Sequence, residues 1–226
     1  MAWVWTNFDK IWGLTVAHVG LSVVPIIVGF ILSIPLGYAA SRSRVARSIL
    51  LSAGGILYTI PSLAFFLAIP AIIGTSILDP VNVIVALTVY AVAVMVRTAT
   101  DAFSSVPADV QDSARAMGFS RFQQFFGVDL PLAGPVLLAG VRVVSVSTVS
   151  LVSVGVLIGV SSLGSLFTEG FRIAFYTEIW TGIVATLLIA AIFDVVIVLV
   201  ARILMPWNRR STVRRQRALA RRAAAA

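Results

Sequence analysis

The chain has 226 residues, of which 59% are hydrophobic and only 12% are charged, about half the charged share of an average soluble domain. A single soluble core could not bury so much apolar surface, so the composition favours a membrane protein. With no Cys and one His, the sequence excludes disulfides, thiol catalysis and Cys/His metal sites.

Long uncharged stretches follow one another along the sequence. Charged residues are absent from 11–41, 48–78, 80–96 and 143–168, and Asp194 is the only one within 179–201. A helix needs about 20 mainly apolar residues to cross the hydrocarbon core. We therefore predict an all-α membrane protein with five transmembrane helices, near 14–39, 49–74, 81–98, 135–160 and 179–204.

The first apolar stretch is expected to be retained, because the N-terminal residues lack the basic region and cleavage site of a signal peptide. Its His18 has no identifiable partner in the sequence, and we expect it to serve in packing or in interface hydrogen bonding.

The second predicted span contains the helix-breaking residues Gly54, Gly55, Pro61 and Pro70. We expect a kinked helix whose freed carbonyl groups bond to neighbouring helices or to a water-filled path. Pro61 and Ser62 lie at the expected break. Irregular backbone there either lines a cavity or forms a purely structural kink.

The positive charges predict the orientation of the spans. With the N-terminus outside, the outer segments contain only Lys10 and Arg172. The inner segments contain Arg42, Arg44, Arg47, Arg97, Arg115, Arg121, Arg202 and seven arginines between 209 and 222. We therefore predict a multi-pass protein of the cell (inner or plasma) membrane, with the N-terminus outside and the C-terminus cytoplasmic.

This topology predicts a transmembrane domain over 1–208 and a basic cytoplasmic tail over 209–226. We expect the tail to anchor the topology. The alternative is that it senses ionic strength through anionic lipids, because salt screens such attraction. Seven of the 17 basic residues lie in this membrane-adjacent tail, and this placement argues against a nucleic-acid partner.

The longest connection, residues 99–134, is predicted to lie in the cytoplasm and contains two short helices. Ser105 is expected to cap the first helix, with Pro107 and Asp109 in its first turn, and Gly118 to end it. Ser120 is expected to cap the second helix.

The second helix would carry an aromatic face made of Phe119, Phe122, Phe125 and Phe126. Pro131 and Pro135 are expected to separate this unit from the fourth span. Such a pair of amphipathic helices forms either a re-entrant or membrane-surface hairpin or a docking element for a cytoplasmic partner.

This connection resembles a cytoplasmic motif of ABC importer permeases, E-A-A-x3-G-x9-I-x-L-P. Asp112-Ser113-Ala114 is followed at the family's spacing by Gly118, Val128, Leu130 and Pro131, with Asp in place of Glu and Ser in place of the first Ala.

Elsewhere, "TIPSLA" (59–64), "PLAGPVLLAGVRVV" (131–144) and Asp194 resemble permeases that import osmoprotectants such as glycine betaine, choline and carnitine. The stretch "GVSSLG" (159–164) departs from the "GAGGLG" of that family.

The resemblance implies a permease of the type I ABC importer kind, a non-catalytic subunit that binds no cofactor itself. Its partners would be two cytoplasmic ATPase subunits that bind ATP and Mg, a second permease subunit (identical or homologous), an extracytoplasmic substrate-binding protein and membrane lipids. The chain has no G-x-x-x-x-G-K-[ST] phosphate-binding loop, so the ATPase must be a separate chain.

The resemblance also implies which residues couple the permease to the ATPase. Val110, Ala114 and Met117 would enter a groove on the ATPase, and Asp112 and Arg115 would make polar contacts at its rim. The full set expected to couple is Val110, Asp112, Ser113, Ala114, Arg115, Met117, Gly118, Leu130 and Pro131.

Six residues are candidates for the translocation path: Pro61, Ser62, Phe65, Tyr90, Arg142 and Asp194. Phe65 and Tyr90 either stack on a quaternary ammonium or pack ordinarily. Arg142 and Asp194 either pair across spans, or Arg142 snorkels to the interface while Asp194 is protonated or bonded to a hydroxyl.

Other classes of function fit less well. An intramembrane serine protease would need a base beside a serine, but His18 is the sole histidine and no G-x-S-x-G occurs. A channel or secondary transporter would show an inverted repeat or a ring of polar groups, and neither is present. Within the importers, the alternative substrate is an amino acid such as methionine.

Overall fold

The computed structural model describes residues 2–207, and the basic tail over 209–226 lies outside the described residues. The described residues form helices and no strand: α1 (Ala2–Thr6), α2 (Phe8–Arg42), α3 (Arg44–Thr59), α4 (Ser62–Ile73), α5 (Pro80–Ser104), α6 (Ala108–Ala116), α7 (Arg121–Gln124), the π-helix η1 (Phe125–Asp129), α8 (Leu130–Val152), the 3-10 helix η2 (Ser153–Ile158), α9 (Gly164–Arg172) and α10 (Tyr176–Leu204).

The described helices include four or five candidate membrane crossings. By length and apolarity, four described helices can each cross a membrane: α2, α5, α10 and the 38-residue run from Arg121 to Ile158 that contains α8. The bent pair α3 and α4 passes the same test as one broken span. The predicted all-α architecture is thereby confirmed, and the described helices provide four spans, or the predicted five if the bent pair is one span.

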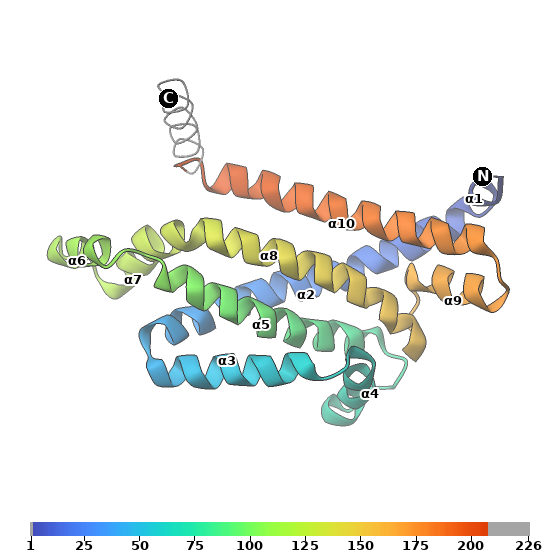
Figure 1. The fold of residues 1–226 in the computed structure, drawn as a ribbon, viewed down its shortest axis with the longest axis horizontal. Coiled ribbons are helices and arrows are strands. Elements are labelled where there is room, and N and C mark those ends of the chain that lie inside the picture. The colour runs from blue at the N-terminus through green and yellow to red at the C-terminus, as the bar shows by residue number, and fades with distance from the viewer. Residues whose placement is uncertain (1, 208–226) are drawn as a thin grey trace, which may run out of the picture.

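The molecule is an elongated bundle in which α2, α5, α8 and α10 run along the long axis (Figure 1). One end carries α6 and α7 and the last turns of α2 and α10. We call this the α6 end. The opposite end, which carries α1 and α9, is called the α9 end. The residues 105–129 between α5 and α8, which we call the α6 loop, thus lie on the same side of the bundle as the end of α10, as the predicted topology requires.

Close contact between α2 and α5 forms the centre of the bundle. Gly29, Ser33 and Gly37 are spaced by four residues on α2, so they share one face, and all three are buried. A Cβ atom built on Gly37 would lie 2.8 Å from the carbonyl carbon of Ala99 and 2.9 Å from the backbone nitrogen of Thr100. Only glycine fits this approach without moving a neighbouring backbone.

The second span breaks at Pro61, where α3 and α4 meet at 107°. Ile60, the residue before the proline, is extended with ψ of 127°, as steric conflict with the proline ring requires. The carbonyl of Ile60 accepts a 2.6 Å hydrogen bond from the hydroxyl of Tyr90 on α5. A neighbouring helix therefore satisfies the backbone at the break, which was one of the two expected solutions.

Two expectations about the connection between the third and fourth spans are wrong. α5 continues to Ser104, and the Ser105 hydroxyl bonds to the carbonyl of Ala102, so it caps no following helix. The helical run is also unbroken through Pro131 and Pro135. The π-turn before them shifts the bonding register, with the Leu130 N–H reaching back to the carbonyl of Phe125. Pro131 has no N–H to donate, and this irregular turn lies directly before it, so the helix continues through the proline.

The contact at Gly37 predicts a specific loss of stability. Gly37→Ala should lower the free energy of unfolding by about 1–3 kcal/mol, because the added methyl group overpacks the α2–α5 contact. Gly20→Ala is the matched control on the same helix, since a Cβ there would meet nothing within 4 Å. Denaturation of the purified protein in detergent measures both variants, and equal stabilities would contradict the prediction.

Candidate functional site

The helix α6 ends in an elbow whose geometry requires Gly118. This residue has a φ of +83°, in the left-handed region that favours glycine. The Gly118 N–H donates to the carbonyl of Arg115 at 3.0 Å, and the Phe119 N–H donates to that of Ala114 at 3.1 Å. These two bonds form a Schellman motif, so the expected role of Gly118 in ending the helix is confirmed.

The helix that follows the elbow begins with a capping box. The Ser120 hydroxyl accepts from the Gln123 N–H, and the Gln123 side chain accepts from the Ser120 N–H. This arrangement satisfies two donors that a helix start otherwise leaves open. The expected cap at Ser120 is therefore confirmed, and both ends of the elbow are defined by local hydrogen bonds.

The α6 loop presents an apolar surface at the α6 end of the molecule. Met117 is 69% exposed and Phe122 is 73% exposed, and Val110, Phe119 and Phe126 are also exposed. Their exposure together at one end leaves an apolar patch that a partner can cover.

The structure corrects the expected environment of Ala114. This side chain is only 1% exposed and packs inside the chain, so it is not available to a partner groove. Asp112 and Arg115 pair with each other at 3.0 Å, and both remain exposed. Ser113 is exposed as well, and its hydroxyl bonds to the Asp109 carbonyl. Leu130 instead packs against a buried cluster of the bundle.

A group of polar side chains that the sequence reasoning missed holds the loop to the bundle. We call Tyr38, Arg42, Gln111 and Asp129 the polar hub. Arg42, at the end of α2, donates to Asp129 Oδ2 at 2.8 Å and to Gln111 Oε1 at 2.9 Å. The Tyr38 hydroxyl donates to Asp129 Oδ2 at 3.3 Å. One guanidinium therefore joins α2, α6 and η1.

An aromatic cluster lies beside the polar hub. The ring of Tyr38 is 5.3 Å from that of Phe103 on α5 and 4.8 Å from that of Phe125 on η1, both in edge-on geometry. Such contacts add to the burial of the rings themselves. The hub is thus supported by packing between three helices.

One signal in the sequence points to Asp129. It is the sole charged residue between Arg121 and Arg142, and it occupies the variable position between Val128 and Leu130 of the resemblance motif. The structure buries it to 1% exposure, and its Oδ1 has no hydrogen-bond partner among the described residues. A lone carboxylate in an apolar stretch needs a counter-ion, but its distance from Arg42 in the sequence conceals the pair.

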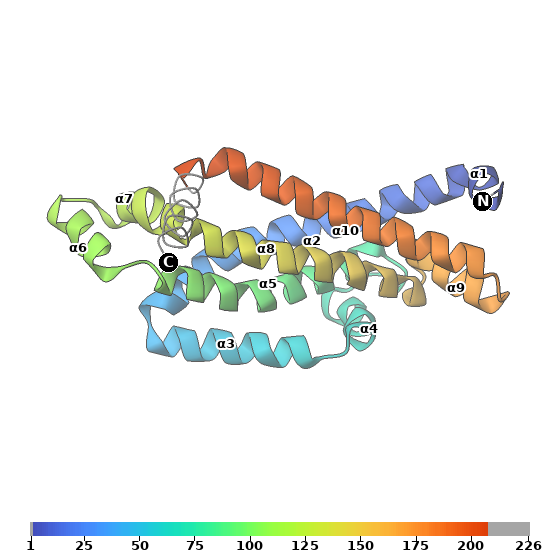
Figure 2. The same ribbon diagram turned by 45° about the horizontal axis from the view of Figure 1, so that its top comes forward.

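The candidates for the translocation path form two separate groups. Pro61, Ser62, Phe65 and Tyr90 lie at the break of the second span, where the rings of Phe65 and Tyr90 meet edge-on at 5.3 Å. Both rings are buried, so the described contacts are those of ordinary packing. Arg142 of α8 and Asp194 of α10 instead contact each other. The helix α5 lies between α8 and the pair α3 and α4 (Figure 2).

Arg142 and Asp194 are paired, as one of the two expectations held. Arg142 Nε donates to Asp194 Oδ1 at 2.5 Å, and Nη2 donates to Oδ2 at 2.9 Å. This two-point geometry is the strongest form of an arginine–carboxylate contact. The alternatives in which Arg142 snorkels or Asp194 finds a hydroxyl are therefore not the arrangement observed.

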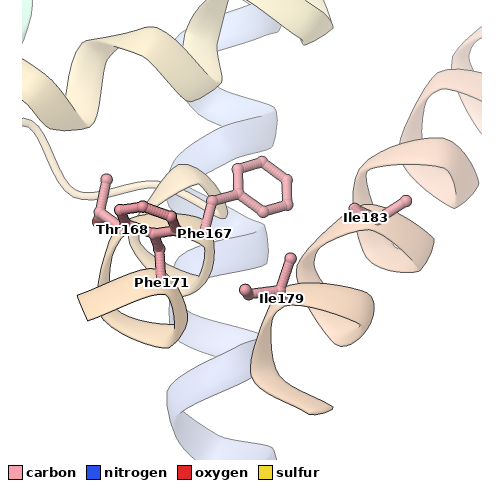
Figure 3. Close-up of a pocket in the computed structure, with 5 residues that line it drawn as sticks. All are labelled: Phe167, Thr168, Phe171, Ile179 and Ile183. Carbon is pink, nitrogen blue, oxygen red and sulfur yellow. The ribbon is translucent and has the colours of Figure 1, made fainter. Parts of the chain in front are cut away.

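The α9 end contains an open apolar pocket of about 510 Å³. Figure 3 shows its lining: Phe167, Thr168 and Phe171 from α9, and Ile179 and Ile183 from α10. The Thr168 hydroxyl donates to the Ser165 carbonyl, and the other four lining side chains are apolar.

Beside this pocket, an ion cluster fastens the helices of the α9 end. Lys10 of α2 contacts Glu169 of α9 at 2.6 Å and the buried Glu178 of α10 at 2.9 Å. No group of three metal-ligating side chains occurs among the residues that the structure describes.

Comparisons with known proteins identify relatives over most of the chain. The profile of a family described as "Binding-protein-dependent transport system inner membrane component" matches residues 26–210. The choline transport system permease protein OpuBB of Bacillus subtilis is 27% identical over 201 residues, covering 89% of this chain and 91% of that protein. The glycine betaine/carnitine/choline transport system permease protein OpuCD of the same organism is 30% identical over 190 residues, covering 84% and 82%.

Among solved structures, a chain of the MetNI methionine ABC transporter in an inward-facing conformation is similar, with a TM-score of 0.70. The two chains are 22% identical, and the match covers 86% of this chain and 98% of that one. This likeness shows a shared fold.

The polar hub predicts a large difference between two arginine variants. Arg42→Ala should lower the free energy of unfolding by about 3 kcal/mol, because it leaves the buried Asp129 carboxylate without its counter-ion. Arg47→Ala is the matched control: its partner Asp101 is 58% exposed, and such pairs contribute below about 1 kcal/mol. Adding Asp129→Asn to Arg42→Ala should recover part of the loss. Equal losses for the two arginines in denaturation experiments would argue against the hub.

Proposed function

Because the chain belongs to the family of inner membrane components of binding-protein-dependent transport systems, we propose that it forms the path for a quaternary amine in an ATP-driven importer. The solute would be glycine betaine, choline or carnitine. Relatives whose names state these solutes match over four-fifths or more of this chain. ATP hydrolysis belongs to a separate subunit in such a system.

The observation that carries the proposed coupling to an ATPase is the geometry of the α6 loop. A rigid elbow at Gly118 presents Val110 and Met117 as exposed apolar side chains at one end of the bundle. Exposed apolar side chains on a short helix suit a groove on a partner protein. The partner proposed here is the cytoplasmic ATPase, with one ATPase subunit for each of two permease subunits and a binding protein on the opposite side.

The polar hub supports a route by which force would pass into the membrane. Arg42 contacts α6 through Gln111 and η1 through Asp129, and η1 leads directly into α8. A displacement of α6 by the ATPase would therefore act on the end of α2 and on the start of α8 together. The Asp112–Arg115 pair would lie at the edge of the contact, where both side chains are exposed.

The arginines support placing the α6 end in the cytoplasm. Arg42, Arg44 and Arg47 lie where α2 meets α3, and Arg115 and Arg121 lie in the α6 loop. Positive charge concentrates on the cytoplasmic side of membrane proteins. In this orientation the N-terminus is outside and α9 faces the binding protein.

Uptake measurements test the proposed solute class. In cells that lack this chain, restoring it together with its ATPase and binding protein should restore ATP-dependent uptake of glycine betaine or choline. Methionine is the comparison solute, because the fold is shared with a methionine transporter. Uptake of methionine without either quaternary amine would replace the proposed class by the amino-acid alternative.

The elbow predicts a variant that separates coupling from membrane insertion. Gly118→Trp should abolish uptake, because a side chain at a φ of +83° strains the backbone and moves α6 away from its docking position. Insertion into the membrane should be unchanged, since the spans are not touched. Measuring both the amount of chain in the membrane and the uptake separates these effects.

Gly74→Trp is the control for the cost of the backbone strain alone. Gly74 has a φ of +76° and open space around it, but it lies between α4 and α5, away from the α6 loop. Its variant should retain most of the uptake. Normal uptake by Gly118→Trp would refute the coupling role of the loop.

A further inference from the structure

One ion pair lies in the middle of the membrane-spanning helices. Arg142 lies ten positions before Val152, where α8 ends at the α9 end of the molecule. Asp194 lies ten positions before Leu204, where α10 ends at the opposite, α6 end. This is about 15 Å at the rise of an α-helix, half the thickness of the hydrocarbon core. Of the charged residues in the described helices, only these two lie at least ten positions from both helix ends.

The pair is accessible on the surface of the single chain. The side chain of Arg142 is 47% exposed and that of Asp194 is 32% exposed. Val143 and Val146 on the same helix are exposed beside it. Lipid offers no hydrogen-bond partners and solvates charge poorly. In the assembled importer this surface must therefore face protein or water, and the proposed function supplies a water-filled path.

We propose that Arg142 and Asp194 form a transient binding site for a zwitterionic solute that carries a carboxylate and a quaternary ammonium, such as glycine betaine or carnitine. The inference rests on the proposed function and names the residues that would contact the solute during its passage. The guanidinium would take the carboxylate, and Asp194 would take the ammonium.

The geometry of the pair matches this exchange. Asp194 now occupies two donors of Arg142 in a two-point contact. A solute carboxylate has the same shape and can take the same two donors. The released Asp194 then lies beside the solute's ammonium group, which has no N–H to donate and so needs a counter-ion. The pair and the solute are each neutral, so no step leaves an uncompensated charge in a region of low dielectric.

This exchange distinguishes solutes with and without a carboxylate. Choline has the quaternary ammonium but a hydroxyl in place of the carboxylate, so it would use Asp194 and leave Arg142 without an anionic partner. Arg142 should therefore matter more for glycine betaine than for choline. A residue that merely braces α8 against α10 would affect both solutes equally.

Uptake by the complete importer, with its ATPase and binding protein, tests the site. Arg142→Gln should lower glycine betaine uptake about tenfold more than choline uptake, because a charged two-point contact is lost. The binding protein is the same in all variants, so a change in the ratio arises in the membrane. The double variant Arg142→Gln/Asp194→Asn should show the same fall in the ratio of glycine betaine uptake to choline uptake, because Arg142 is lost in both variants. Its two neutral amides can bond to each other, so it replaces Arg142→Gln if that variant assembles poorly.

The matched control is a second Arg–Asp pair. Arg47→Gln/Asp101→Asn removes a pair at 3.3 Å that lies near the ends of α3 and α5, and it should leave the ratio unchanged. An equal fall for both solutes, or no fall, in the Arg142 variants would overturn the site. Uptake of neither solute by the unmodified importer would instead refute the proposed function.

A labelling experiment tests water access without relying on transport. The chain contains no Cys, so a single introduced cysteine reports its own surroundings. Val143→Cys, beside the pair, should react with a charged, membrane-impermeant thiol reagent during turnover, and glycine betaine should slow the reaction. Ile31→Cys is the control, an exposed residue in the middle of α2. Equal resistance of both cysteines would contradict a water-filled path at the pair.

Discussion

A carboxylate is buried where the α6 loop joins the helix bundle, and its contact with Arg42 determines how the loop is held. Asp129 is 1% exposed, and Arg42 Nη2 lies 2.8 Å from its Oδ2. Removing a charge from water is costly unless an opposite charge accompanies it, so this pair stays together in the folded protein. The same guanidinium contacts Gln111, so the position of α6 follows from the place where α2 ends.

The helix α5 connects this hub to the break in the second span. Near the end of α5, Phe103 packs against Tyr38, and one turn earlier Ala99 meets Gly37. Nearer the start of α5, the Tyr90 hydroxyl bonds to the Ile60 carbonyl at the break. These contacts are tight or directional, and closely packed interiors transmit displacement instead of absorbing it. A movement at the α6 end is therefore expected to reach the irregular backbone at Pro61 through α5.

The ion pairs differ in role according to their depth. Lys10 with its two glutamates fastens the α9 end, and Arg42 with Asp129 fastens the α6 end. Both lie near helix ends, where water or headgroups can solvate the exposed partner. Arg142 and Asp194 lie at least ten positions from either end of their helices and are exposed on the single chain, so their solvation depends on what the assembled importer places against them. This difference in surroundings separates fastening pairs from one that a solute can approach.

The sequence by itself determined the features that depend on local chemistry. Apolar length predicts the spans, proline predicts the break at Pro61, and the positive φ of an elbow suits Gly118. Tertiary structure alone decided that Ala114 faces inward, that Asp129 meets Arg42, that Tyr90 satisfies the break and that the helix runs through Pro131. Periodicity shows that a helix has an apolar face, and the sequence shows where a charge stands alone in an apolar stretch. Which neighbour covers that face or neutralises that charge depends on how segments distant in the sequence pack together.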